Sequence, residues 1–177
     1  MSSSLIAWTN QPLLLYHGTL TQYRDSILAG IDLTKSLPYT DFGLGFYTTT
    51  SIEAAARRAR DKQAIMKAVT NIEDKPMVIR YEVERNALAQ LECLWFINAQ
   101  PDAVDFWSFV YYCRDEKLHA TGHNRKVGNG YYDIVIGAIT DDWRQRTILP
   151  NSDQISFHTP QAIALLHISK TAAIVVE

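Results

Sequence analysis

The feature that most constrains the fold is an apolar run over residues 132–139, which only Asp133 and Gly137 interrupt. Alternating polarity would indicate a strand with one face in water, whereas a continuous apolar run of this length is typical of a strand buried on both faces. The chain must therefore cover both sides of at least part of a sheet.

The rest of the chain mixes strand and helix signals. Strands are predicted over residues 13–16, ending in a tight turn at His17-Gly18-Thr19, and over residues 46–49, 77–83, 91–97, 154–158 and 172–176. Helical spacing predicts helices over residues 21–29, 50–69, 102–117 and 161–167, the second with a capping box formed by Thr50 and Glu53. Because these elements do not alternate regularly as βαβ units, they favour an α+β fold.

Length and composition indicate one globular domain over residues 1–177, with its core from about residue 12 onward. The chain is 47% hydrophobic and 20% charged, which is typical of a globular protein rather than a disordered one. A formal net charge of -2 argues against a globally basic nucleic-acid binder. Neither a signal-peptide pattern nor a run of about 18 apolar residues is present, so we expect a cytoplasmic protein without membrane contact.

Two glycine-containing segments carry the chemical signal. The P-loop, the dinucleotide GxGxxG, HExxH and GxSxG patterns are all missing, and Cys93 and Cys113 have no metal-ligand spacing, so no metal is expected. Taken singly, a histidine at a strand end and a tyrosine in a strand are ordinary structural residues. Here they occur together with glycines, in Leu15-Tyr16-His17-Gly18-Thr19 and Phe42-Gly43-Leu44-Gly45-Phe46-Tyr47-Thr48-Thr49. This combination indicates a binding site.

The two segments resemble the first two motifs of the ADP-ribosyltransferase superfamily, in its poly-ADP-ribose polymerase and diphtheria-toxin-like branch. Those motifs are a strand ending in His-Gly-Ser/Thr and a Gly-x-Gly-Ile/Phe-Tyr segment that opens a helix. A third family motif is a strand carrying a glutamate, and residues 153–157 occupy its place. The resemblance is closest to a bacterial ADP-ribosyltransferase-like family long without an assigned function, which shares the Tyr-Asp-Ile-Val-Ile-Gly stretch at residues 132–137. It implies an ADP-ribosyltransferase-like fold with two apposed, mainly antiparallel sheets and flanking helices.

The resemblance also implies a site for NAD, which would be the substrate. By resemblance His17 contacts the adenosine-side ribose, the backbone of Gly18 clamps the nicotinamide amide, and Thr19 adds a polar contact. Tyr47, which follows Gly45 and Phe46, would stack on the nicotinamide ring, a contact that contributes about 0.5–1.5 kcal/mol beyond burial. Arg58 is a candidate partner for the NAD phosphates or for an anionic acceptor.

The third motif departs from the family, because Gln154 stands where family enzymes have glutamate. A glutamine forms hydrogen bonds but cannot act as a general base. Another group must then take the acceptor proton, or the domain binds NAD with little transfer. Asp133, Asp141 and Asp142 are candidates for the base, although aspartates at strand ends commonly anchor turns. Asp153 is expected to face the opposite side of the strand from Gln154.

The function implied is mono-ADP-ribosyl transfer rather than polymer elongation, with a protein or a nucleic acid as acceptor. A toxin with a protein antitoxin, a phage-defence enzyme or an effector would fit by analogy. The basic residues of the second helix form either a solvated face or a contact for nucleic-acid phosphates; they are Arg57, Arg58, Arg60 and Lys62. Two alternatives stay open: a catalytically weak sensor of NAD or ADP-ribose, and a module that docks a partner.

Overall fold

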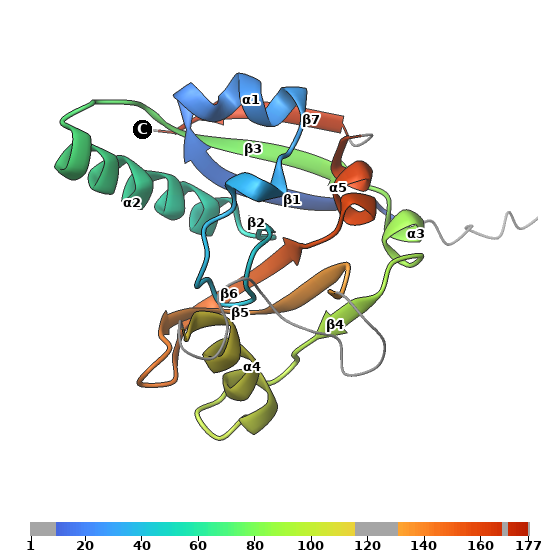
Figure 1. Ribbon diagram of the computed structural model, residues 1–177. Coiled ribbons are helices and arrows are strands. Elements are labelled where there is room, and N and C mark those ends of the chain that lie inside the picture. Colours follow the sequence, from blue (N-terminus) through green and yellow to red (C-terminus); the bar gives the residue numbers. More distant parts are fainter. Residues whose placement is uncertain (1–9, 116–130, 168–169, 177) are drawn as a thin grey trace, which may run out of the picture.

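The computed structural model describes residues 10–115, 131–167 and 170–176, and within them the chain forms two sheets (Figure 1). The first has the order β1-β3-β7 and is antiparallel throughout. The second has the order β2-β6-β5-β4 and is antiparallel except where β4 pairs with β5. The strands are β1 (Leu13–Leu20), β2 (Phe46–Thr48), β3 (Pro76–Val83), β4 (Cys93–Trp95), β5 (Ile134–Asp142), β6 (Thr147–Phe157) and β7 (Lys170–Val175).

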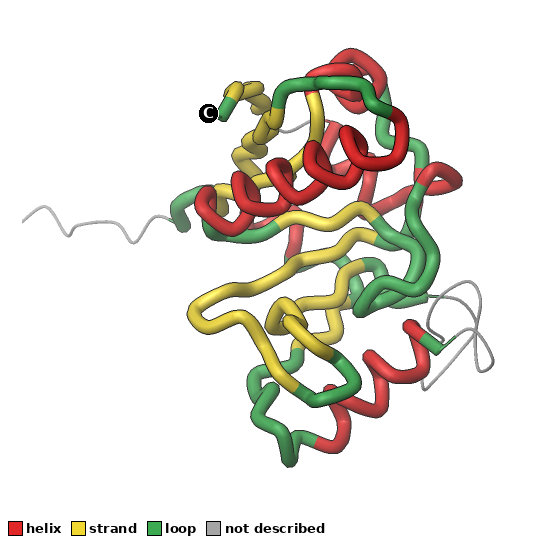
Figure 2. The backbone as a smooth tube through the Cα atoms, turned by 90° about the vertical axis from the view of Figure 1, so that its left-hand side faces the viewer, coloured by secondary structure: helices red, strands yellow, loops and turns green. Residues whose placement is uncertain are grey.

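The described helices are η1 (Thr21–Tyr23), α1 (Arg24–Ala29), η2 (Leu33–Lys35), α2 (Ile52–Thr70), α3 (Arg85–Leu88), α4 (Val104–Arg114) and α5 (Pro160–His167). Helix α2 lies on the outer face of the first sheet and α4 on the outer face of the second, and Figure 2 shows this arrangement from the side. The predicted α+β class with two mainly antiparallel sheets is confirmed. No helix in the described part of the chain is long and apolar enough to cross a membrane.

The main core lies between the two sheets. Buried side chains of β1 and β3 pack there against β2, β5, β6 and α5, including Leu15, Ile79, Phe46, Ile134, Phe157 and Leu166. A second cluster lies on the other face of the second sheet, where Phe106, Trp107 and Val110 of α4 pack with Val135. Successive residues Ile134 and Val135 of β5 thus enter different clusters, which confirms a strand buried on both faces.

Helix α2 covers the outer face of the first sheet. Ala55 and Ala56 pack with Val78 of β3, and Ala59 is fully buried. The helix begins one residue later than the predicted capping box: the Ser51 hydroxyl accepts from Ala54 N–H at 3.1 Å, whereas Thr50 Oγ1 donates to Asp153. Its predicted apolar face also ends early, since Val69 is 78% exposed. Only the first half of α2 is therefore held by the sheet.

Several predicted boundaries were wrong because pairing between distant strands decides them. His17-Gly18-Thr19 is not a turn but part of β1, which continues to Leu20 because β3 supplies partners along its whole length. Strand β6 begins at Thr147, not at residue 154, because Thr147 and Ile148 pair with the end of β5. Strand β4 is shorter than expected, α4 begins at Val104, and the predicted end of α4 at residue 117 lies outside the described residues.

Candidate functional site

The two motifs meet where an edge of each sheet comes together. Tyr16 and Thr49 exchange both backbone hydrogen bonds, at 2.8 and 2.9 Å; Tyr16 belongs to β1 of the first sheet, and Thr49 directly follows β2 of the second. One residue further along β1, His17 Nδ1 bonds the carbonyl oxygen of Tyr47 at 2.6 Å. The chain therefore brings the histidine segment of β1 directly beside the glycine-tyrosine segment of β2.

This hydrogen bond fixes the chemistry of the His17 ring. A carbonyl oxygen can only accept, so Nδ1 carries the proton and the neutral ring has an unprotonated Nε2. The ring also stacks on Phe46, with centroids 4.2 Å apart. Burial and the nearby charges of Lys62 and Arg58 lower the pKa of His17 to about 3, against the raising effect of the bond to Tyr47. At neutral pH His17 is thus a neutral ring with Nε2 as an acceptor, which suits a ligand hydroxyl.

The low pKa of His17 makes stability depend on pH. Its pKa falls from 6.5 to about 3 on folding, so between these values the unfolded chain binds a proton that the folded chain does not. The His17 contribution is therefore complete above pH 6.5 and is lost as the pH falls toward 3. Urea unfolding at several pH values should show that His17→Gln loses less stability than wild type between neutral and acidic pH. Equal losses in the two proteins would contradict the assignment.

Gly18 presents its backbone to the same edge of β1. The backbone N–H and C=O of Tyr16 point toward Thr49 and away from β3. Gly18 lies two residues further along β1 in a regular register, so its backbone N–H and C=O also point away from β3. Its carbonyl accepts from Lys62 Nζ at 2.8 Å. Among the described residues, no acceptor contacts its N–H. A glycine is also required sterically, because a Cβ there would lie 2.0 Å from the carbonyl oxygen of Ala55.

Lys62 was not predicted as a site residue. It lies on α2 one turn after Arg58, and instead of extending into water its ammonium contacts Gly18. Burial, then the charge of Arg58, lowers the pKa of Lys62 to about 8. Arg58 itself is exposed, and neither cation forms an ion pair within the described part of the chain. Two positive charges thus lie beside His17 without a carboxylate partner from these residues.

The Tyr47 ring lies on the opposite face of β2 from the Phe46 ring, because neighbouring side chains of a strand alternate. Since the His17 ring stacks on Phe46, the Tyr47 ring also faces away from His17. Its hydroxyl bonds Thr40 Oγ1 at 2.8 Å, accepts from Phe42 N–H at 3.0 Å and donates to the Gly43 carbonyl at 2.7 Å. Burial raises the pKa of Tyr47 well above its ordinary value. The structure therefore joins His17 to Tyr47 through the backbone, while the two rings lie on different faces.

Residues 44–45 are held in place by His158. His158 Nδ1 bonds the Leu44 carbonyl at 2.7 Å and Nε2 bonds Ser156 Oγ at 2.7 Å. Gly45 leaves room for this ring, since a Cβ would lie 2.7 Å from two of its atoms. His158, which sequence reasoning missed, therefore fixes the segment that carries Tyr47. Thr19 is buried in β1, with 2% of its surface exposed.

Gln154 and Asp153 face opposite sides of β6, as predicted. Asp153 anchors the start of α2 by accepting from Thr49 Oγ1 and Thr50 N–H, both at 2.8 Å. Gln154 shares the face of Tyr47, because Tyr47 pairs with Ser156, two residues further along β6. Its amide donates to Asp41 Oδ2 at 2.6 Å and to the Ala138 carbonyl at 2.8 Å. The Gln154 side chain is thus a member of a buried polar network.

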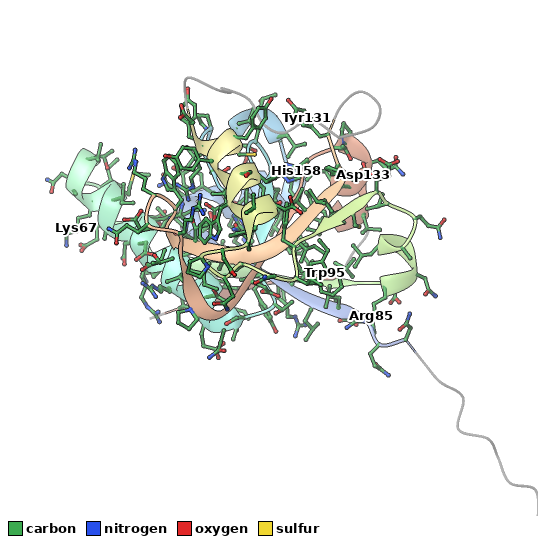
Figure 3. The ribbon with its side chains drawn as sticks, turned by 90° about the horizontal axis from the view of Figure 1, so that it is seen from below. Lys67, Arg85, Trp95, Tyr131, Asp133 and His158 are labelled. Carbon is green, nitrogen blue, oxygen red and sulfur yellow. The ribbon has the colours of Figure 1, made fainter. Side chains whose placement is uncertain are left out.

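The three aspartates suggested as bases lie at the two ends of β5, and none of them is among the groups that contact His17 in the described residues. Asp133 precedes β5 and accepts from Thr159 Oγ1 and Glu92 N–H; Figure 3 shows it beside His158, whose N–H donates to its carbonyl. Asp142 ends β5 and accepts from two backbone N–H groups of the following turn. Asp141 is exposed at the same end. Asp133 thus ties the start of β5 to two distant segments, whereas Asp142 anchors the turn at the other end of the strand.

No group of three or more histidine, cysteine, aspartate or glutamate side chains that could hold a metal occurs in the described ranges. The polar atoms beside His17 are instead a neutral imidazole, backbone groups and two cations. Such a set suits an organic anion with hydroxyl and amide groups.

One family model matches the chain, over residues 13–149, and its description is "Protein of unknown function (DUF3990)". The matched range includes the segments of His17 and Tyr47 and ends before Gln154. Neither a curated protein nor a solved structure matches. Since the match covers most of the 177 residues, the chain belongs to the DUF3990 family.

Proposed function

We propose that this protein is an NAD-dependent mono-ADP-ribosyltransferase with an ADP-ribosyltransferase-like fold. The observation that carries the proposal is the bond between His17 and the Tyr47 carbonyl, which joins the two motif strands at 2.6 Å. It is supported by the polar edge of Gly18 and by Arg58 and Lys62, which have no ion-pair partner among the described residues. NAD offers a matching set of groups: an amide, ribose hydroxyls and a pyrophosphate.

Each part of NAD has a counterpart in this arrangement. The nicotinamide amide would meet the backbone of Gly18, whose N–H can donate to the amide oxygen. His17 Nε2 would accept from a ribose hydroxyl. The pyrophosphate would lie near Arg58 and Lys62, where its charge would offset the burial and the repulsion from Arg58 that together lower the pKa of Lys62. In the reaction, the bond between nicotinamide and ribose breaks, the acceptor atom bonds the ribose carbon, and the acceptor loses a proton.

The cation pair gives a testable prediction. Lys62→Met and Arg58→Met should each weaken NAD binding by about tenfold, because a hydrogen bond to a charged group contributes about 1.5–3 kcal/mol. Binding of free nicotinamide, which has no phosphate, should change much less. Lys67→Met on the same helix, which removes an exposed lysine paired with Glu73, is the matched control. Isothermal titration calorimetry measures these affinities, and unchanged NAD affinity in both site variants would exclude this phosphate site.

The proposed function is tested by transfer of label. Purified protein is incubated with total cell lysate and NAD labelled in the adenylate phosphate, then treated separately with protease and with nuclease. We expect label on one class of macromolecule, absent with His17→Ala. Loss on protease treatment identifies a protein acceptor, and loss on nuclease treatment a nucleic acid. Nicotinamide release without any labelled macromolecule would contradict the transferase assignment.

A second candidate, a sensor that binds NAD or ADP-ribose without transfer, is favoured by Gln154. Its amide hydrogens are engaged by Asp41 and Ala138, and it has no carboxylate to activate an acceptor. Saturable NAD binding without nicotinamide release would support this candidate.

For the transferase, we propose a role as a toxin, phage-defence enzyme or effector in the cytoplasm, with an antitoxin protein as a further partner. Growth arrest on expression that depends on His17 would support that role.

A further inference from the structure

Asp41 lies at the centre of the network that holds Gln154. Its side chain is 4% exposed, and it comes from the segment between η2 and β2. Oδ1 accepts from Arg114 Nε and from Thr140 Oγ1, each at 2.6 Å. Oδ2 accepts from Thr140 N–H at 3.0 Å and from Gln154 Nε2 at 2.6 Å. The carboxylate is therefore saturated by donors from α4, β5 and β6.

The environment fixes which way the Gln154 amide points. An amide nitrogen has two hydrogens, and here they go to a carboxylate oxygen of Asp41 and to the Ala138 carbonyl. The flipped amide would set its oxygen against these two acceptors, which leaves buried polar groups unpaired. Oε1 is therefore the only atom of the amide that can take another hydrogen bond, and it can only accept.

The same geometry excludes an ionised glutamate at position 154. Its carboxylate would face Asp41 Oδ2 and the Ala138 carbonyl, so that three acceptor groups would meet with no proton among them. Like charges at such a distance in a buried site cannot both stay ionised. A glutamine at position 154 therefore fits beside the Asp41 carboxylate, and each of the two side chains supplies what the other requires.

The segment of Asp41 also binds Tyr47. Thr40 Oγ1, Phe42 N–H and the Gly43 carbonyl all bond the Tyr47 hydroxyl. Tyr47 and Gln154 lie on one face of the second sheet, so residues 40–43 connect Gln154 with Tyr47, the residue that the resemblance predicts to stack on the nicotinamide ring. Asp41 is then in a position to orient Gln154 beside that predicted contact without touching the ligand.

We propose that Asp41 is the positioning residue of Gln154: it holds the amide so that Oε1 accepts from a ribose hydroxyl of NAD, and it makes glutamine the residue required there. The proposal rests on the proposed function for the identity of the ligand. On this proposal, Gln154 stands in place of the family's glutamate because Asp41 requires an amide there, and not because a catalytic group has been lost.

A double-mutant cycle in the full chain tests the pair. Asp41→Asn and Gln154→Glu should each weaken NAD binding by about tenfold or more and lower the melting temperature, because a buried hydrogen bond to a charge is lost. In the double variant the amide and the carboxylate exchange positions, so a donor again faces an acceptor between these two side chains. The carboxylate at position 154 still faces the Ala138 carbonyl, and Arg114 loses its ion-pair partner, so the rescue is partial. This variant should bind NAD more tightly and melt higher than Gln154→Glu alone. Asp105→Asn, an exposed aspartate on α4, is the control and should change neither property.

Additive losses in the cycle, with NAD binding intact in wild type, would overturn the proposal and leave the proposed function standing. Rescue of the melting temperature without rescue of NAD binding would also overturn it, because Asp41 would then serve the fold alone. Wild-type protein that binds no NAD would instead refute the proposed function and this positioning role with it.

Discussion

Replacing Gly18 with alanine should destabilise the folded protein by about 3 kcal/mol, the upper end of the usual cost of overpacking. The added Cβ would lie 2.0 Å from the Ala55 carbonyl oxygen and 2.9 Å from its carbon, both backbone atoms of α2. Neither can move aside as a flexible side chain would, so α2 must shift away from the first sheet. Urea unfolding followed by circular dichroism measures the loss.

Gly30→Ala is the matched control for this substitution. Gly30 follows α1 with an extended backbone, φ 163°, that any residue can adopt. We expect the free energy of unfolding of the Gly30→Ala protein to stay within about 0.5 kcal/mol of the wild-type value, as for most surface substitutions. A Gly18→Ala protein as stable as Gly30→Ala would show that α2 does not approach β1 as closely as described.

Replacing His17 with alanine should weaken NAD binding by about tenfold to a hundredfold and reduce nicotinamide release at least as much. The substitution removes the acceptor Nε2 and the bond that ties β1 to the Tyr47 carbonyl, each contributing about 0.5–1.5 kcal/mol. It also opens a space beside Phe46, on which the ring stacks. Titration calorimetry and chromatography of released nicotinamide measure the two effects.

His17→Gln distinguishes the hydrogen bond of the His17 side chain to NAD from the packing of its ring on Phe46. A glutamine side chain can still accept a hydrogen bond but cannot stack as a ring, so we expect an NAD affinity between those of wild type and His17→Ala. His17→Ala protein that remains folded and binds NAD as wild type does would remove His17 from the site.

The sequence predicted the fold well where local pattern decides it. The apolar run at residues 132–139 identified β5, and Thr159 before Pro160 marked the start of α5, where the Thr159 hydroxyl accepts from Ala162 N–H. It failed where distant partners decide. Nothing within residues 17–19 indicates that β3 will pair with them and extend β1, and the hydroxyl of Thr50 does not cap α2 because Asp153 binds it.

The candidate site was predictable in its strand segments but not in its supporting residues. Asp41 bonds residues 73, 99 and 113 positions away in the chain, so no local spacing could indicate its role. Lys62 belongs by pattern to the basic surface of α2, and only the three-dimensional structure directs it to Gly18. His158 follows the end of β6 without any motif around it. These residues act through long-range contacts, which a short motif does not contain.

The most direct test of the central claim observes the Gly18 amide itself. Its N–H points to the open edge of β1, so in ¹⁵N-labelled protein its proton resonance reports any acceptor that binds there. Titration with nicotinamide should shift this resonance downfield in a saturable manner, whereas pyridine, which lacks the amide group, should not. A Gly18 resonance that stays in place at saturating nicotinamide would contradict the proposed NAD site.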